Sequence, residues 1–179
     1  MNSHINDLGL FEREYPGWLK RKRELLEAGQ FVEALADYPW VAHQSAPFSP
    51  FSGELSQMRV ALLSTAGLFA KKDQPPFDAE NIEGDWHHRE LSTELEPAQL
   101  EIAHTHFNHQ SAQEDLDSVY PIHRLRELAA GGVIGELAET AYSISGYCLQ
   151  ADKLVRQTIP AIVQGMQDEG VQAALFIPV

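Results

Sequence analysis

Three of the eight histidines lie close together in a short segment, at positions 104, 106 and 109. Residues 101–107 have the pattern of a strand, in which alternate side chains share a face. His104 and His106 are therefore expected side by side, with His109 just beyond the strand. Histidine can act as a cation or supply a proton near neutral pH, and we predict a catalytic role for both. The alternative is that one or both are structural, hydrogen-bonded histidines.

The same cluster allows a second chemistry, which is metal binding. His104, His106 and His109 could supply three nitrogen ligands and Asp115 a carboxylate, a set that suits zinc or iron. The spacing matches no established metal motif, so we predict no bound metal. A metal-dependent enzyme that uses the histidine cluster stays open as an alternative function.

Polar residues also follow a short apolar run at residues 60–65, which is typical of a central strand in a parallel sheet. Ligands of open α/β sheets bind outside the carboxyl ends of the strands. Ser64, Thr65 and Gly67 fall at that end and are predicted to bind substrate, although a plain turn would give the same pattern.

Two charged pairs complete the candidate set. Asp85 and Arg89 could bind the amine or the carboxylate of a substrate, since arginine offers a planar fork to carboxylates, or they could form an internal ion pair. Asp115 and Asp117 are predicted to hold a structural loop by accepting hydrogen bonds from backbone N–H groups.

The elements that must position these residues alternate between strands and helices. Strands are predicted at 60–65, 86–91, 101–107, 141–147 and 171–179, and helices at 13–37 (interrupted at Gly29), 121–130 and 151–169 (interrupted at Pro160). The alternation predicts a three-layer α/β/α fold with a mostly parallel sheet. We divide the chain into a helical N-terminal arm and connector, residues 1–57, and a reductase-like α/β domain, residues 58–179. Whether this domain is truncated at its C-terminus stays open.

Composition excludes several classes of partner. The net charge of −13 argues against nucleic acid and anionic membranes, and no apolar run is long enough to span a membrane. No secretory signal is visible, and the single Cys148 fits a reducing compartment, so a cytoplasmic location is expected. A lone cysteine also excludes an internal disulfide and a redox pair within the chain.

Several segments, taken in order, resemble the glycine/sarcosine/betaine/D-proline reductase selenoprotein B family. The resemblance runs from about Arg59 to Val179 and is strongest from Asp115 to Ala138. The segments are RVALLSTAGLF, PPFD, GDWHHREL, HTHFNH, DLDSVYPIHRLRELAAGGVIGELA, YSISGY and AALFIPV. Arg124 matches the family pattern and is assigned to the structural loop, whereas Asp117 stands where the family often has asparagine.

The resemblance implies a selenol- or thiol-dependent reductase, or the N-terminal part of one, that cleaves a small amino-acid-like substrate. In the family a selenocysteine or cysteine follows the strand that ends here at Val179, so that residue is expected directly after it, and the 179-residue chain is expected to be inactive. No other cofactor is expected in the chain. An external thiol or dithiol, or a partner reductase subunit, would regenerate the selenol, in a homo- or hetero-oligomer. The alternative is a non-catalytic α/β binding or assembly module.

Overall fold

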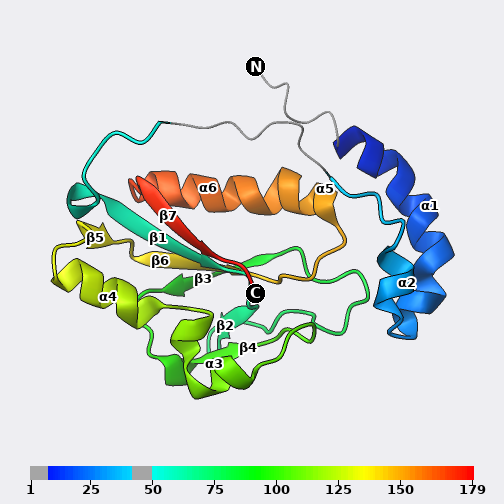
Figure 1. The fold of residues 1–179 in the computed structure, drawn as a ribbon, viewed down its shortest axis with the longest axis horizontal. Coiled ribbons are helices and arrows are strands. Elements are labelled where there is room, and N and C mark those ends of the chain that lie inside the picture. Colours follow the sequence, from blue (N-terminus) through cyan, green and yellow to red (C-terminus); the bar gives the residue numbers. More distant parts are fainter. Residues whose placement is uncertain (1–7, 42–49) are drawn as a thin grey trace.

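A computed structural model describes residues 8–41 and 50–179 and places a mixed, mostly parallel sheet between helices (Figure 1). The helices and strands are α1 (Leu8–Glu27), α2 (Phe31–Leu35), β1 (Arg59–Ser64), β2 (Leu68–Ala70), β3 (His88–Ser92), β4 (Leu100–Ile102), α3 (Gln110–Glu114), α4 (Ile122–Ala130), β5 (Glu136–Leu137), β6 (Thr140–Ile144), α5 (Ala151–Lys153), α6 (Ile159–Asp168) and β7 (Ala173–Ile177). The predicted α/β class and the N-terminal helices are confirmed.

The central strand is β1, which is apolar on both faces because both are covered. One edge of β1 pairs in parallel with β5 and then β6, and the other edge pairs in parallel with β7. The outer strand β3 runs antiparallel to β6. The carboxyl ends of β1, β6 and β7 therefore meet at one edge of the sheet, where a site of an α/β protein is expected.

Helices cover both faces of this sheet (Figure 1). Leu63 and Tyr142 pack against Ile162 of α6 on one face, and Leu62 belongs to the larger core that includes Ile122 of α4 on the other. The larger core also packs on a small second sheet, in which β2 and β4 run antiparallel. The sequence patterns did not predict this second sheet.

Gly165 lets α6 lie close to the sheet, and we expect alanine there to be destabilising. A Cβ atom at Gly165 would lie 2.2 Å from the hydroxyl oxygen of the buried Tyr142. The Gly165→Ala variant should lose about 1–3 kcal/mol of unfolding free energy through overpacking. Gly9→Ala is the matched control, because Gly9 is also helical but has open space around it, and should be neutral or stabilising by up to about 1 kcal/mol. Urea denaturation measures both, and equal effects would contradict this account.

The N-terminal helices pack on the sheet domain through their own apolar cluster. Phe11, Trp18 and Leu26 are buried with Leu149 from the main domain. The Tyr38 hydroxyl donates a hydrogen bond to the Leu149 carbonyl (2.9 Å), which fixes the contact. Helix α1 starts at Leu8, five residues before the predicted start. The predicted boundary at residue 57 stays a prediction, and residues 42–49 of the predicted connector lie outside the described residues.

The prediction of a strand over residues 101–107 is wrong beyond residue 102. Strand β4 spans only Leu100–Ile102, and its pairing ends with the hydrogen bond from Ala103 N–H to the Gly67 carbonyl (2.9 Å). The His104 ring then accepts the N–H of His106 (3.0 Å), which turns the chain out of the extended conformation. His104 and His106 therefore do not share a strand face.

The last strand, β7, lies at an edge of the sheet among the described residues, although its sequence is mostly apolar. Within the described residues β7 pairs only with β1. Phe176 is 61% exposed, and Leu175 and Val179 are partly exposed. An apolar run is compatible with an interior or an edge position, because strand order is set by the neighbours with which it pairs.

The remaining elements deviate less from expectation. Strand β3 begins two residues late and β6 ends three residues early. The helix predicted at 151–169 is interrupted as expected, by a π-helical turn at Leu154–Thr158 that precedes Pro160, whose missing N–H suits the first turn of α6. No helix in residues 8–41 and 50–179 could cross a membrane.

Candidate functional site

The carboxyl ends of β1, β6 and β7 converge around Gly146. Thr65 follows β1, and its side-chain oxygen accepts a hydrogen bond from Val179 N–H (2.8 Å). Thr65 N–H donates in turn to the Ile177 carbonyl (3.0 Å). A Cβ atom placed on Gly146 would lie 3.1 Å from each of three atoms, the Thr65 carbonyl oxygen, the Val179 carbonyl oxygen and His104 Nε2. The absent side chain of Gly146 therefore allows the histidine and the strand ends to approach the same point closely.

The buried His104 ring faces two backbone N–H groups. His106 N–H lies 3.0 Å from Nδ1 and Tyr147 N–H lies 3.2 Å from Nε2. A neutral imidazole has one acceptor nitrogen and one N–H, so only one of these contacts can be a hydrogen bond to the ring at a time. In either tautomer one of the two contacts is a hydrogen bond, and the other ring nitrogen carries the proton. The backbone of residues 106 and 147 thereby fixes the His104 ring beside Gly146.

Burial disfavours the charged form of His104. Together with smaller effects of the neighbouring His106 and His109, it lowers the pKa of the ring from 6.5 to about 4. The two N–H groups that face the ring oppose a second ring proton as well. His104 is therefore uncharged near neutral pH, and its neutral ring can accept a proton or donate a hydrogen bond.

The other two histidines of the segment hold the loop of residues 103–109 in place. The His106 ring is stacked on Tyr147 (centroids 3.8 Å apart, 8° between planes) and meets the edge of Phe31 from α2. His109 Nε2 donates to the His104 carbonyl (2.5 Å). The rings of His104 and His106 remain neighbours, with centroids 5.9 Å apart, although His106 is exposed and His104 is buried.

The predicted loop after β1 lies at this edge of the sheet, and Ser64, Thr65 and Gly67 each make a different contact there. The buried Ser64 hydroxyl donates to the Val119 carbonyl (2.7 Å), which ties β1 to the segment before α4. Gly67 has φ +69°, and a Cβ there would lie 2.7 Å from the Ala103 carbonyl oxygen, so glycine permits the close approach of the His104 loop. Thr65 contacts Val179 directly, and substrate binding by these residues stays a prediction.

Asp85 and Arg89 are bound within the protein. Burial raises the pKa of Asp85, but hydrogen bonds from the N–H groups of His87 and Asp78 outweigh it and hold the pKa below its usual value. Arg89 donates to the carbonyls of Pro75 and Pro76 and lies 3.7 Å from Asp85. This geometry favours the internal ion pair that was the alternative to substrate binding.

The acidic loop before α4 binds its own backbone. Asp115 accepts the N–H of Asp117 (3.0 Å), and Asp117 accepts the N–H of His123 (3.3 Å). Arg124 lies 3.4 Å from the second oxygen of Asp117 and also contacts Glu127. The side chains of the two aspartates thus fix the backbone at the start of α4 by accepting hydrogen bonds from it.

The metal-site alternative and the single cysteine, Cys148, remain to be placed. Among residues 8–41 and 50–179, no three His, Cys, Asp or Glu side chains are arranged to hold a metal, so the metal-site alternative lacks its ligand set. Burial raises the pKa of the Cys148 thiol to about 11, which keeps it protonated and unreactive near neutral pH.

Sequence reasoning missed Gly146 and Tyr147, which complete the site. A usable signal was present, because both directly follow a strand, β6, that pairs with β1. Residues after neighbouring parallel strands share one edge of the sheet. The link from His109 to the His104 carbonyl had no such signal, since it depends on how the loop of residues 103–109 turns.

The chain matches a protein family over most of its length. The family model described as glycine/sarcosine/betaine reductase selenoprotein B matches residues 29–178. The chain belongs to this family. The resemblance in the sequence patterns began at Arg59, whereas the family match begins 30 residues earlier, at residue 29. The match therefore includes α2. Phe31 of α2 contacts His106 in the His104 loop.

Two curated relatives extend the comparison. The D-proline reductase subunit gamma of Acetoanaerobium sticklandii is 28% identical over 129 residues, which cover 72% of this chain and 52% of that protein. The glycine reductase complex component B subunit gamma of Symbiobacterium thermophilum is 27% identical over 112 residues, or 62% and 26% of the two chains. This member of the selenoprotein B family thus spans about half of the first relative and about a quarter of the second. No solved structure gives a significant match.

Proposed function

We propose that this chain is the histidine-bearing part of a selenol- or thiol-dependent reductase subunit. The reaction would be reductive cleavage of a bond beside nitrogen in a small amino-acid-like substrate, in the cytoplasm, with a thiol donor or partner subunit as reductant. The observation that carries the proposal is the convergence of Thr65, Gly146 and Val179 on the neutral His104. The family and the printed names of the two relatives support the reaction class.

The residues around Gly146 fit a reactive residue joined to Val179. Thr65 fixes the N–H of Val179 and so directs the carbonyl of that residue toward Gly146. Because Gly146 has no side chain, the Val179 carbonyl and the His104 ring can lie around the same point, so a residue joined to Val179 would begin beside His104. A selenocysteine or cysteine bound there would supply the nucleophile that attacks the substrate reductively.

His104 is the proposed proton carrier of this reaction. Contacts with the backbone N–H groups of His106 and Tyr147 hold its ring beside Gly146. The neutral ring can accept the proton of the selenol or thiol, and the imidazolium that forms can pass that proton to the leaving amine. The Tyr147 ring stacks on His106 and thereby fixes the loop that orients His104.

The first test is to measure turnover by a protein that carries a selenocysteine or cysteine segment directly after Val179. The second test is to determine the gene sequence beyond codon 179. With dithiothreitol as reductant, we expect reduction of at least one of D-proline, glycine, sarcosine and betaine, and none by the 179-residue chain alone. His104→Gln should lower kcat by about a hundredfold or more, because general acid catalysis contributes about that much.

The matched control for this assay is His88→Gln. The His88 side chain lies beside Glu90 on β3, and no described hydrogen bond joins it to Thr65, His104 or Val179, so its replacement should leave kcat unchanged. Absence of turnover with all four substrates, by a protein with an intact selenol or thiol, would refute the proposed function. Equal losses in the two histidine variants would remove His104 from the mechanism.

A further inference from the structure

The His104 ring is held by the backbone of two residues whose own side chains are stacked on each other. The N–H groups of His106 and Tyr147 lie 3.0 Å and 3.2 Å from the two ring nitrogens of His104. The rings of His106 and Tyr147 are almost parallel, with 8° between their planes and 3.8 Å between their centroids. The separation of the two N–H groups that hold His104 therefore depends on how closely these two side chains pack.

Phe31 of α2 closes this stack from the N-terminal arm. Its ring is packed edge-to-face against His106, with centroids 4.9 Å apart and 73° between planes. It is packed in the same way against Tyr147, at 5.8 Å and 74°. The charge distribution of aromatic rings favours edge-to-face contacts. One residue of the arm thus contacts both side chains whose backbone holds His104.

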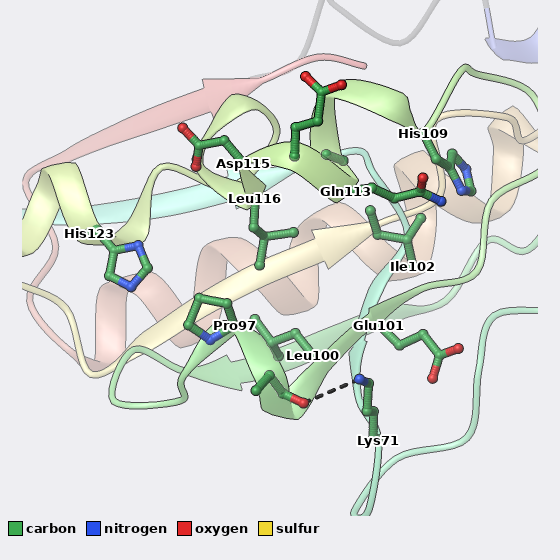
Figure 2. Close-up of a pocket in the computed structure, with 13 residues that line it drawn as sticks. Lys71, Pro97, Leu100, Glu101, Ile102, His109, Gln113, Asp115, Leu116 and His123 are labelled. Carbon is green, nitrogen blue, oxygen red and sulfur yellow. Dashed lines mark hydrogen bonds between the residues drawn. The ribbon is translucent and has the colours of Figure 1, made fainter.

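Open space borders the loop of residues 103–109 at two places. Figure 2 shows the first, a cavity of about 670 Å³ with the His109 ring at its edge. The second is a cavity of about 290 Å³ between the arm and the sheet domain, which Phe31 and Thr105 help to line. Surrounding atoms do not confine the loop at these places, so its position depends more strongly on the aromatic contacts with the arm.

The other ends of these contacts are fixed. The Tyr147 hydroxyl donates a hydrogen bond to the Ile82 carbonyl (2.7 Å), so its ring cannot follow a loop that moves away. The arm is anchored by the hydrogen bond from Tyr38 to the Leu149 carbonyl. The family match begins at residue 29, so it includes Phe31 but none of α1. The segment that supplies Phe31 therefore belongs to the unit that the family shares.

We propose that Phe31 is a positioning residue for His104 and that α2 is therefore part of the active site. Phe31 acts through His106 and Tyr147. With its ring in place the two side chains stay stacked, their N–H groups stay on either side of the imidazole, and the imidazole stays beside Gly146. The inference rests on the proposed function in taking His104 to be the proton carrier. It assigns a task to an arm for which the sequence patterns indicated none.

Loss of the Phe31 ring should admit water to the surroundings of His104. Burial is the main cause that holds the pKa of His104 at about 4, so water should raise this pKa. The other titratable groups here are His106 and His109, together with Glu80 and Tyr147, which face His106. A proton on His106 would lower the pKa of His104. A rise therefore cannot come from that neighbour and must report the opening of the site.

The test is the titration of His104 in the 179-residue chain, followed by NMR of the imidazole nitrogens between about pH 7.5 and pH 5. The wild-type ring should stay neutral over this range. In Phe31→Ala the pKa should rise toward 6.5 by about one pH unit or more, so that the ring begins to titrate. Phe31→Leu keeps an apolar side chain without the ring edge. It should raise the pKa in the same direction, and it replaces the alanine variant if that variant does not fold.

Two control variants separate positioning from a general loosening of the arm. Val32→Ala changes the next residue of α2, which is 86% exposed, and should leave the pKa of His104 unchanged. Tyr38→Phe removes the hydrogen bond to Leu149 and should lower the urea midpoint of unfolding without moving that pKa. An unchanged pKa in the Phe31 variants, or an equal rise in Tyr38→Phe, would overturn the proposal.

Turnover distinguishes this inference from the reductase proposal. In the protein that carries a selenocysteine or cysteine segment after Val179, Phe31→Ala should lower kcat about tenfold or more, because the proton carrier is no longer held in place. A raised pKa in a protein that reduces none of the four substrates would keep the positioning and refute the reaction. Turnover that Phe31→Ala leaves unchanged would keep the reaction and refute the positioning.

Discussion

Gly84→Ala is expected to lower the unfolding free energy by about 2–5 kcal/mol, a large part of the stability of a typical domain. Gly84 has φ +74°, which costs a residue with a side chain about 1–2 kcal/mol. A Cβ there would also lie 2.2 Å from the Tyr147 carbonyl oxygen and 2.9 Å from Cys148 Cα. Overpacking against backbone atoms adds about 1–3 kcal/mol, because backbone cannot rotate away. Urea denaturation followed by circular dichroism measures the loss.

Gly29 separates the two causes. Its φ of +71° is nearly the same, but a Cβ there would meet no atom within 4 Å. Gly29→Ala should therefore cost only the conformational part, about 1–2 kcal/mol. Equal losses in the two variants would show that the contact with residues 147–148 is unimportant. The contact matters for the site because it fixes the segment that carries Tyr147.

Acid should destabilise the protein by about 3 kcal/mol through His104 alone. The pKa of the folded ring is about 4, and that of an unfolded histidine is about 6.5. Below pH 6.5 the unfolded chain therefore binds a proton that the folded chain does not, so stability falls as the pH drops from about 6.5 to about 4. The stabilisation is fully present above pH 6.5. The groups that face the ring are His106, His109 and the N–H of Tyr147.

The measurement is the pH dependence of the unfolding free energy in the wild type and in His104→Gln. The slope between about pH 6.5 and pH 4 should be smaller in the variant by the amount assigned to His104. NMR of the imidazole nitrogens provides an independent check, since His104 should remain neutral to about pH 4. A ring that titrates near pH 6.5 would refute the effect of burial on His104 and the role built on its neutral form.

Much of the fold was predictable because burial leaves a clear trace in sequence. The apolar run of β1 identified the central strand, since both faces of that strand are covered. Pro160 correctly marked a break before α6, because proline lacks the N–H that a helix interior requires. The length of β4 and the edge position of β7 were not predictable. The first depends on a bond between the His104 ring and the backbone, and the second depends on pairing with β1.

The site was predictable where strand ends define it. Thr65 and His104 were predicted and lie beside the same point, the Cα of Gly146. The shared orientation of His104 and His106 was wrong, because the strand ends before them. Asp85 and Arg89 could not be placed from spacing alone, since the same pattern serves an ion pair and a ligand. Only the three-dimensional contacts distinguish these two uses.

The open side of β7 has a consequence for how the protein behaves at high concentration. A phenyl ring next to exposed backbone hydrogen-bonding groups is a template on which another chain can add a strand, and so a start for aggregation. The charge of −13 opposes such encounters through mutual repulsion between molecules. Dissolved salt screens that repulsion without weakening the attraction at Phe176, so colloidal stability of the 179-residue chain should decrease as the ionic strength rises.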